Sequence, residues 1–88
     1  MRIDLYLHRI RLVKTRSLAQ ALVATGRVGL AGRRLAKPSE PVRPGSIVAL
    51  PLRGEVRIIE VLALPARRGP PAEARQHYRE IDEPAPTT

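Results

Sequence analysis

Apolar residues recur at helical spacing at the start of the chain. Ile3, Leu7 and Ile10 are spaced i, i+4 and i+7, which predicts an amphipathic helix over residues 3–13 with one buried face. Asp4 falls in the first turn, where a negative charge suits the positive end of the helix dipole. We therefore interpret Asp4 as a residue that favours the start of this helix rather than as a catalytic acid.

A second helix is predicted from Arg16 to Thr25. Thr15 is a suitable N-cap, because its hydroxyl oxygen can accept a hydrogen bond from a free backbone N–H of the first turn. Gly26 suits the position after the helix, where a left-handed backbone costs glycine little. The face that we expect to pack is formed by Leu18, Ala21, Leu22 and Thr25.

The pattern after the second helix predicts a tight β-hairpin. Residues 27–35, RVGLAGRRL, are typical of two short strands with a turn at Ala31-Gly32. Asn-Gly is the preferred pair in such turns, so Ala31 is a poorer choice where φ must be positive. A loop broken by prolines, residues 37–45, follows the hairpin.

A second hairpin is predicted in the middle of the chain. Its strands fall over residues 46–52 and 55–64, where apolar residues alternate imperfectly with polar ones. Arg53-Gly54 provides the turn between them. Pro51 lacks a backbone N–H, which indicates a strand end or a sheet edge at that position.

The composition changes after the second hairpin, where a linker rich in proline and arginine begins. Residues 72–80 are expected to form a short helix, begun by Pro71 in its first turn. Residues 83–88, EPAPTT, are expected to be disordered. We therefore divide the chain into a domain over residues 1–65 and a C-terminal extension over residues 66–88.

The composition limits the chain to one small domain with an aliphatic core. The 88 residues include no phenylalanine, tryptophan or cysteine and only two tyrosines. Without cysteine the chain has no disulfide, no thiolate metal site and no thiol nucleophile. No apolar run approaches the ~20 residues of a membrane span, and charges interrupt the N-terminus too often for a secretory signal. We expect a cytoplasmic protein.

Positive charge is concentrated in the first part of the chain. The formal net charge is +8, and residues 1–37 hold nine lysines and arginines against a single acid, Asp4. Such a patch suits a polyanion, most often a nucleic acid. Codon bias is an alternative explanation for the excess of arginine over lysine, but it does not explain why one segment lacks acids.

The sequence holds no constellation typical of an enzyme. His8 and His77 have no partners at metal-ligand spacing, and neither a catalytic triad nor a glycine-rich phosphate loop occurs. We expect a binding protein without a cofactor, a metal or a small-molecule substrate. The shortage of aromatic side chains favours structured RNA, recognised through phosphate and shape, over stacking on unpaired bases.

Short motifs stand in a fixed order along the chain. They are Arg2-Ile3-Asp4 with Leu7, Lys14-Thr15-Arg16 with Ala19, Gly26-Arg27-Val28, Gly32, and Lys37-Pro38-Ser39. This ordered set resembles the S4 RNA-binding domain. A later run is similar to the small ribosome-associated heat shock protein 15 group within that family, and it comprises Arg67-Arg68, Pro70 or Pro71, Glu73-Ala74 and Tyr78. The resemblance implies an α+β fold of the S4 type (alpha-L), with two N-terminal helices packed on a small, bent antiparallel sheet.

The resemblance also implies a function. Members of the heat shock group bind the large ribosomal subunit and are linked to stalled subunits that still carry a nascent chain on tRNA. RNA is expected to meet the surface formed by the two helices and the loop after them. The residues that the resemblance assigns to RNA binding are Arg2, Arg11, Lys14, Thr15, Arg16, Gln20, Arg27, Arg34 and Lys37.

Two alternatives to ribosomal RNA binding remain open from the sequence. One is a general nucleic-acid or DNA-binding protein, because a basic surface attracts any phosphate backbone. The other is an assembly factor whose basic face binds an acidic protein. In each case we expect a monomer that does not enter a membrane.

Overall fold

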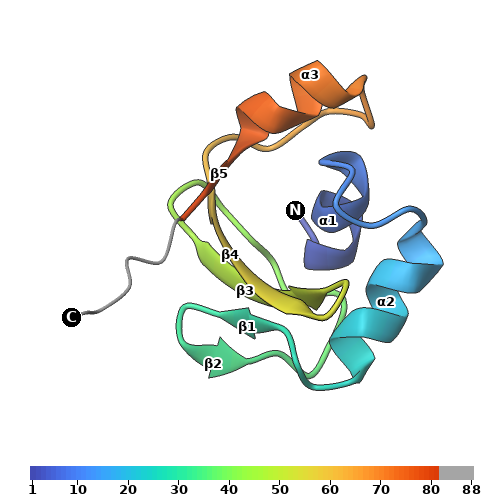
Figure 1. Ribbon diagram of the computed structural model, residues 1–88, viewed down its shortest axis with the longest axis vertical. Helices are drawn as coiled ribbons and strands as arrows, with labels where there is room; N and C mark the ends of the chain where they lie inside the picture. The colour runs from blue at the N-terminus through green and yellow to red at the C-terminus, as the bar shows by residue number, and fades with distance from the viewer. Residues whose placement is uncertain (82–88) are drawn as a thin grey trace.

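Two helices cover one face of an antiparallel sheet, and a short C-terminal helical segment packs at the end of the sheet (Figure 1). The computed structural model describes residues 1–81. The elements are α1 (Ile3–Arg9), α2 (Arg16–Ala24), β1 (Gly29–Leu30), β2 (Arg33–Arg34), β3 (Ile47–Leu52), β4 (Glu55–Val61), α3 (Pro71–Ala74), the 3₁₀ turn η1 (Arg75–His77) and β5 (Tyr78–Glu80). This arrangement confirms the predicted α+β fold.

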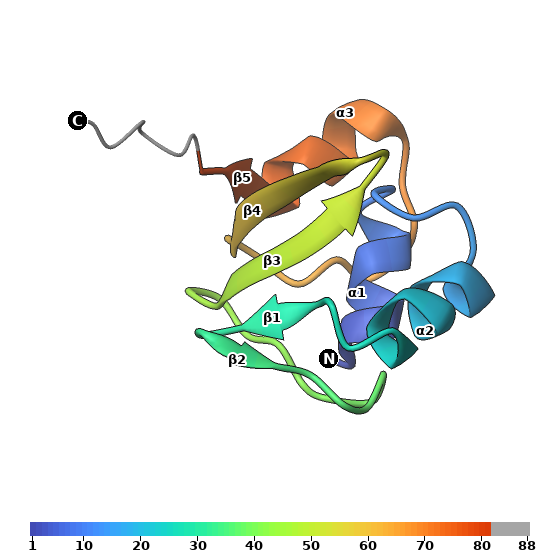
Figure 2. The same ribbon diagram turned by 60° about the horizontal axis from the view of Figure 1, so that its bottom comes forward.

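The sheet has five strands in the order β2-β1-β3-β4-β5, and every neighbouring pair is antiparallel. The β3–β4 hairpin forms the longest ladder, from Ile47 opposite Glu60 to Leu52 opposite Glu55. Figure 2 shows this hairpin crossing the molecule, with its tip close to the loop that follows α1 and to the segment before α3.

The core lies between the two long helices and the inner face of the sheet. Alternate residues of β3 and β4, among them Val48, Leu50 and Ile59, are fully buried. They pack in one cluster with Ile3, Leu7 and other apolar residues of α1. The core is aliphatic except for the ring of Tyr6, as the composition predicts.

Helix α1 is shorter than predicted, because the backbone leaves the helical conformation soon after Arg9. Ile10 caps the helix, and Arg11 has φ 66°, in the left-handed region. The chain nevertheless stays close to the end of the helix, because the backbone N–H groups of Leu12 and Val13 both donate to the carbonyl of Leu7. The resulting turn keeps Val13 buried outside the helix.

Helix α2 begins at the predicted residue and ends at Ala24, one residue before the predicted end, but its packed face differs from the prediction. Leu18 is 52% exposed, and Ala21 and Thr25 are exposed as well, so the predicted face is wrong for these three residues. The buried positions are Ala19 and Val23, with Leu22 half-buried. The two candidate stripes lie side by side on the helix and both are apolar. Contact with α1 therefore selects between them, and the small side chain of Ala19 permits a close approach.

Both hairpin turns lie where the sequence predicts them. Ala31-Gly32 has φ 54° and 84°, and Arg53-Gly54 has φ 52° and 83°. Two consecutive positive φ values match the twist of the flanking strands. Ala31 adopts this conformation without the side-chain hydrogen bonds that help asparagine to do so. Pro51 lies near the end of β3, beyond the residues that pair with β1, as its missing N–H requires.

The C-terminal extension differs from the predicted single helix over residues 72–80. Pro71 begins α3 as predicted, but α3 and η1 end at His77 and the chain then adds β5 to the sheet. The Tyr6 hydroxyl donates a hydrogen bond to the His77 carbonyl at 2.9 Å, which joins α1 to this segment. The predicted disorder of residues 83–88 lies outside the described residues.

Arginine side chains also join the end of α1 to the segment before α3. In each of three contacts, a guanidinium N–H donates to a backbone carbonyl across more than fifty residues of sequence. The donor and acceptor pairs are Arg9 Nη1 with Pro65, Arg11 Nε with Gly69, and Arg68 Nε with His8. These contacts fix the loop after α1 against the C-terminal extension.

Candidate nucleic-acid interface

A buried carboxylate gathers three of the predicted RNA-binding residues. The Asp4 side chain is 0% exposed. Arg2 donates to it twice, from Nε at 3.1 Å and from Nη2 at 3.0 Å. Arg16 Nε donates at 3.4 Å and Gln20 Nε2 at 3.0 Å. We call Asp4, Arg2, Arg16 and Gln20 the Asp4 cluster. The sequence interpretation of Asp4 as a helix-start residue missed this role.

The Asp4 cluster holds its central carboxylate in the charged form. Burial by itself raises the pKa of Asp4, because the charged carboxylate loses hydration. The hydrogen bonds from Arg2, Gln20 and the Leu5 backbone N–H act in the opposite direction, as does the positive charge of Arg16. Together they outweigh burial, and the pKa of Asp4 lies below its ordinary value.

Acidification below about pH 4 is therefore expected to destabilise the fold. The folded pKa of Asp4 lies below the unfolded one, so its contribution is complete above the unfolded pKa and is lost as the pH falls through the folded pKa. A hydrogen bond from Arg57 lowers the pKa of Glu80, so Glu80 contributes to the same sensitivity to acid. An Asp4→Asn variant separates the contribution of Asp4 from that of Glu80. Urea unfolding over a pH series should show a smaller acid loss in the variant. Equal losses in both proteins would contradict a role for Asp4.

The two arginines of the Asp4 cluster remain accessible to a ligand. The side chains of Arg2 and Arg16 are 45% and 44% exposed. Arg16 contacts Asp4 through Nε, and within residues 1–81 its two terminal nitrogens make no hydrogen bond. The carboxylate therefore fixes the base of this guanidinium and leaves its outer edge, with up to four N–H groups, for an anion.

Thr15 and Lys37 flank the Asp4 cluster without joining it. The Thr15 hydroxyl oxygen accepts from Leu18 N at 3.1 Å, so Thr15 is the predicted helix cap. Lys37 is exposed in the loop after β2. This loop lies against the start of α1, where the Asp4 backbone N–H donates to the Pro38 carbonyl at 3.2 Å. Lys37 therefore lies one residue before the contact that joins this loop to α1.

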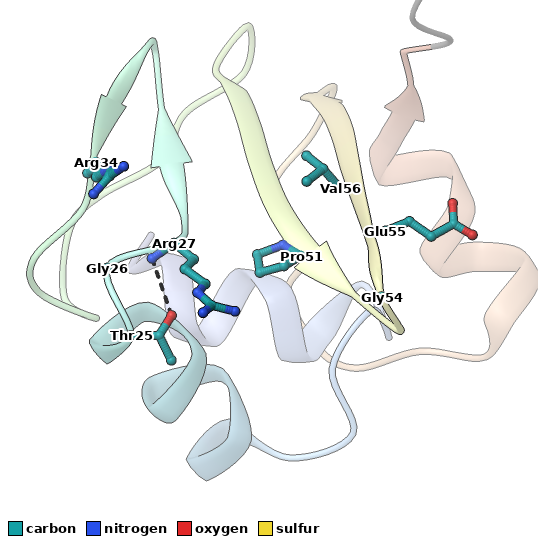
Figure 3. Close-up of a pocket in the computed structure, with 8 residues that line it drawn as sticks. All are labelled: Thr25, Gly26, Arg27, Arg34, Pro51, Gly54, Glu55 and Val56. Carbon is teal, nitrogen blue, oxygen red and sulfur yellow. Dashed lines mark hydrogen bonds between the residues drawn. The ribbon is translucent and has the colours of Figure 1, made fainter.

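Arg27 and Arg34 line a groove of about 570 Å³ between the end of α2, the first hairpin and the tip of the second. Figure 3 shows the Arg27 side chain extending toward Pro51. Its backbone N–H donates to Thr25 Oγ1 at 3.2 Å, which fixes the chain as it leaves α2. Glu55 also lines this groove, so the groove is less uniformly cationic than the predicted residues alone suggest.

Arg11 and Lys14 line a different groove, of about 480 Å³, which we call the Arg11 groove. Its lining residues are Arg11, Leu12, Lys14, Arg53, Arg68 and Pro71. Sequence reasoning assigned no RNA contact to Arg53 or Arg68. Arg68 belongs to the run that resembles the heat shock group, but no local pattern marks either residue as an RNA contact, because both reach the groove from segments far from Arg11 in the sequence. Arg53 lines the Arg11 groove and its neighbour Gly54 lines the groove of about 570 Å³, so both grooves reach the β3–β4 turn.

His8 links the Asp4 cluster to the Arg11 groove electrostatically. Burial lowers the pKa of His8, and the positive charges of nearby arginines lower it further. Those arginines are Arg68, Arg9, Arg16 and Arg11. Arg16 belongs to the Asp4 cluster, and Arg11 and Arg68 line the Arg11 groove, so positive charges of both groups act on His8.

Two other kinds of site are not found in the part of the chain that the structure describes. Over residues 1–81, no three His, Cys, Asp or Glu side chains gather as they would around a metal ion. Over the same range, no helix combines the length and apolarity needed to cross a bilayer.

The chain is similar in sequence to a known domain family and to known proteins. The family model of the S4 domain matches residues 1–48. The heat shock protein 15 homolog of Haemophilus influenzae is 34% identical over 82 residues, which cover 93% of this chain and 62% of that protein. The RQC P-site tRNA stabilizing factor of Helicobacter pylori is 33% identical over 78 residues, which cover 89% of this chain and 92% of that protein.

A solved structure agrees with this assignment. The trimeric structure of Vibrio cholerae heat shock protein 15 superposes with a TM-score of 0.86 at 37% identity, covering 92% of this chain and 81% of that one. The chain spans less than two thirds of the length of the heat shock protein 15 sequences that it matches, 62% in the Haemophilus influenzae case. With a family model that matches more than half of its residues and the same fold, the chain belongs to the S4 family of RNA-binding domains.

Proposed function

We propose that this protein binds ribosomal RNA of the large subunit and acts in the recycling or rescue of stalled large subunits. The observation that carries the proposal is the Asp4 cluster, in which a buried carboxylate orients Arg2 and Arg16 at the protein surface. The names of the relatives support the ribosomal setting, since one is a P-site tRNA stabilizing factor. We assign no catalytic step to the protein and place it in the cytoplasm with the ribosome.

The proposed mechanism is electrostatic and geometric. Lysine and arginine side chains neutralise RNA phosphates and release counterions, so affinity falls steeply as salt rises. The outer edge of Arg16 can hold two phosphate oxygens or the edge of a guanine. The N-terminus of α2 lies beside Arg16 and adds the positive end of its dipole. Structured RNA is favoured, because the surface provides fixed cations rather than aromatic platforms.

The proposed contact set is the nine residues predicted from the sequence. The geometry gives them different weights, since Thr15 is occupied as a cap, while the outer edge of Arg16 makes no hydrogen bond within residues 1–81. The monomer that the sequence predicts is a separate matter. The solved Vibrio cholerae relative is trimeric, which weighs against a monomer and makes the oligomeric state a quantity to measure.

Replacing Arg16 with alanine is expected to weaken binding to large-subunit ribosomal RNA about tenfold, because the oriented guanidinium is lost. The fold should persist, since Asp4 keeps its bonds to Arg2 and Gln20. A filter-binding titration at several salt concentrations measures the effect. The matched control is Arg43→Ala, since Arg43 is also exposed and its side chain makes no hydrogen bond within residues 1–81.

Three results would count against the proposal. Equal affinity of Arg16→Ala and Arg43→Ala would show that only total charge matters. Equal affinity for duplex DNA and ribosomal RNA would favour a general nucleic-acid-binding protein. Salt-resistant binding to an acidic protein, with none to RNA, would favour an assembly factor. In cells, sedimentation of a lysate should place the protein in the large-subunit fraction.

A further inference from the structure

The Arg11 groove is formed by three segments that are distant in sequence. Arg11 and Lys14 come from the loop after α1, Arg53 from the β3–β4 turn, and Arg68 from the segment before α3. Figure 2 shows these three segments meeting beside the tip of the hairpin. Only the folded chain, including residues of the C-terminal extension, brings the four cations together.

Two of the four cations are fixed in place by the backbone. Arg11 Nε donates to the Gly69 carbonyl, and Arg68 Nε donates to the His8 carbonyl. Both contacts use only Nε, so within residues 1–81 the terminal nitrogens of both side chains make no hydrogen bond. A guanidinium held by Nε loses little conformational entropy when its outer edge binds an anion.

The groove carries positive charge without compensation. Its lining includes no acidic residue, and none of its four cations pairs with a carboxylate within residues 1–81. Elsewhere the same protein pairs its arginines, for example Arg33 with Glu40 and Arg57 with Glu80. The absence of a carboxylate from its lining distinguishes this groove from the groove of about 570 Å³, which Glu55 also lines.

Backbone strain is concentrated at the same place. Three residues other than glycine have positive φ within residues 1–81, and two of them, Arg11 at 66° and Arg53 at 52°, line this groove. Such conformations cost side-chain-bearing residues free energy, and they cluster at functional sites. At both positions a long cationic side chain occupies a backbone conformation that asparagine or glycine adopts more easily.

We propose that the Arg11 groove binds the phosphate backbone of the RNA as one site, in which Arg53 and Arg68 act together with Arg11 and Lys14 of the proposed contact set. This proposal rests on the proposed function, and it extends the RNA footprint over Arg53 and Arg68 and onto the C-terminal extension. The volume of about 480 Å³ exceeds what one phosphate ion fills, and it suits a short stretch of sugar and phosphate. The chemistry is recognition of phosphate oxygens by guanidinium and ammonium groups, with no covalent step.

The first test compares two substitutions of arginine by asparagine. Arg53→Asn removes one charge from the groove and leaves an Asn-Gly turn, which the backbone at this position favours, so the fold is retained. Arg43→Asn removes one charge near the opposite end of β3. Arg53→Asn is expected to weaken binding to large-subunit ribosomal RNA about tenfold and to reduce the slope of log affinity against log salt by about one. Equal effects of the two variants would overturn the groove proposal.

The second test uses inorganic phosphate as the probe on the full chain. The side-chain Nε–H signals of Arg11 and Arg68 should shift in NMR spectra as phosphate is added, and Arg53→Asn should reduce those shifts. Signals of Arg43 serve as the control for bulk ionic effects. If Arg11 and Arg68 shift no more than Arg43, the groove is not a phosphate site and the proposal is overturned.

The two tests separate this proposal from the proposed function. If Arg16→Ala weakens RNA binding but Arg53→Asn acts like Arg43→Asn, the groove proposal fails and the proposed function stands. If the unmodified protein binds no RNA but phosphate shifts Arg11 and Arg68, the proposed function and the RNA assignment of the groove both fail.

Discussion

Replacing Asp4 with asparagine is expected to weaken RNA binding about tenfold, although the change raises the net charge from +8 to +9. Long-range electrostatics alone predicts the opposite sign, because each added positive charge attracts the RNA more strongly. The amide, however, presents N–H groups toward the donors of Arg2, Arg16 and Gln20, and it cannot hold all three. The orientation of the two arginines is then lost.

The same variant is expected to lose about 2–3 kcal/mol of unfolding free energy, because hydrogen bonds to a buried charged group are lost. Urea unfolding measures this loss, and RNA titration under conditions in which both proteins are folded measures binding. A second variant, Gln20→Ala, removes one donor and keeps the carboxylate, so it should lose less of both. Tighter RNA binding by Asp4→Asn would show that Asp4 does not position the arginines.

Ending the chain after Pro65 is expected to cost roughly 4 kcal/mol of unfolding free energy, close to the whole stability of a small domain. The truncation removes β5 from the sheet, the half-buried Tyr78 and the fully buried Ala74. It also removes the His77 carbonyl, which leaves the buried Tyr6 hydroxyl without its acceptor. The division of the chain at residue 65 would then separate segments that fold together.

The control for this truncation is a chain that ends after Ile81, which keeps every contact described above. Circular dichroism and urea unfolding should show a cooperative transition for that chain, and a weak or absent one for residues 1–65. A fragment of residues 1–65 that unfolds as cooperatively as the control, at the same urea concentration, would contradict the expectation. It would also support an independent N-terminal domain.

Local signals explain which parts of the fold were predictable. Thr15 and Gly26 mark the ends of α2 by cap and backbone preferences, and both turns carry glycine where a positive φ is required. The sequence of α2 carries two apolar stripes, and contact with α1 decides which of them is buried. The pattern alone therefore did not identify the packed face. Strand β5 covers only Tyr78–Glu80 and forms because β4 has an edge free for pairing. A pattern of three residues is too short to predict such a strand.

The candidate site was predictable in type but not in arrangement. The resemblance identified residues that the fold brings to one carboxylate, among them Arg2 and Arg16. It did not reveal that Asp4 is buried and joins them, because an acid in a first helical turn is ordinarily exposed. Arg53 and Arg68 were missed for a different reason, since their proximity to Arg11 arises only from tertiary packing.

Both edge strands of the sheet carry charged side chains. Strand β2, at one margin, consists of the exposed Arg33 and Arg34, and β5, at the other, carries the exposed Arg79 and Glu80. An unpaired edge strand is a template for aggregation, and like charges side by side on it oppose the addition of a strand from a second molecule. The short β2, with its two exposed arginines, is therefore expected to disfavour strand pairing between molecules at this edge.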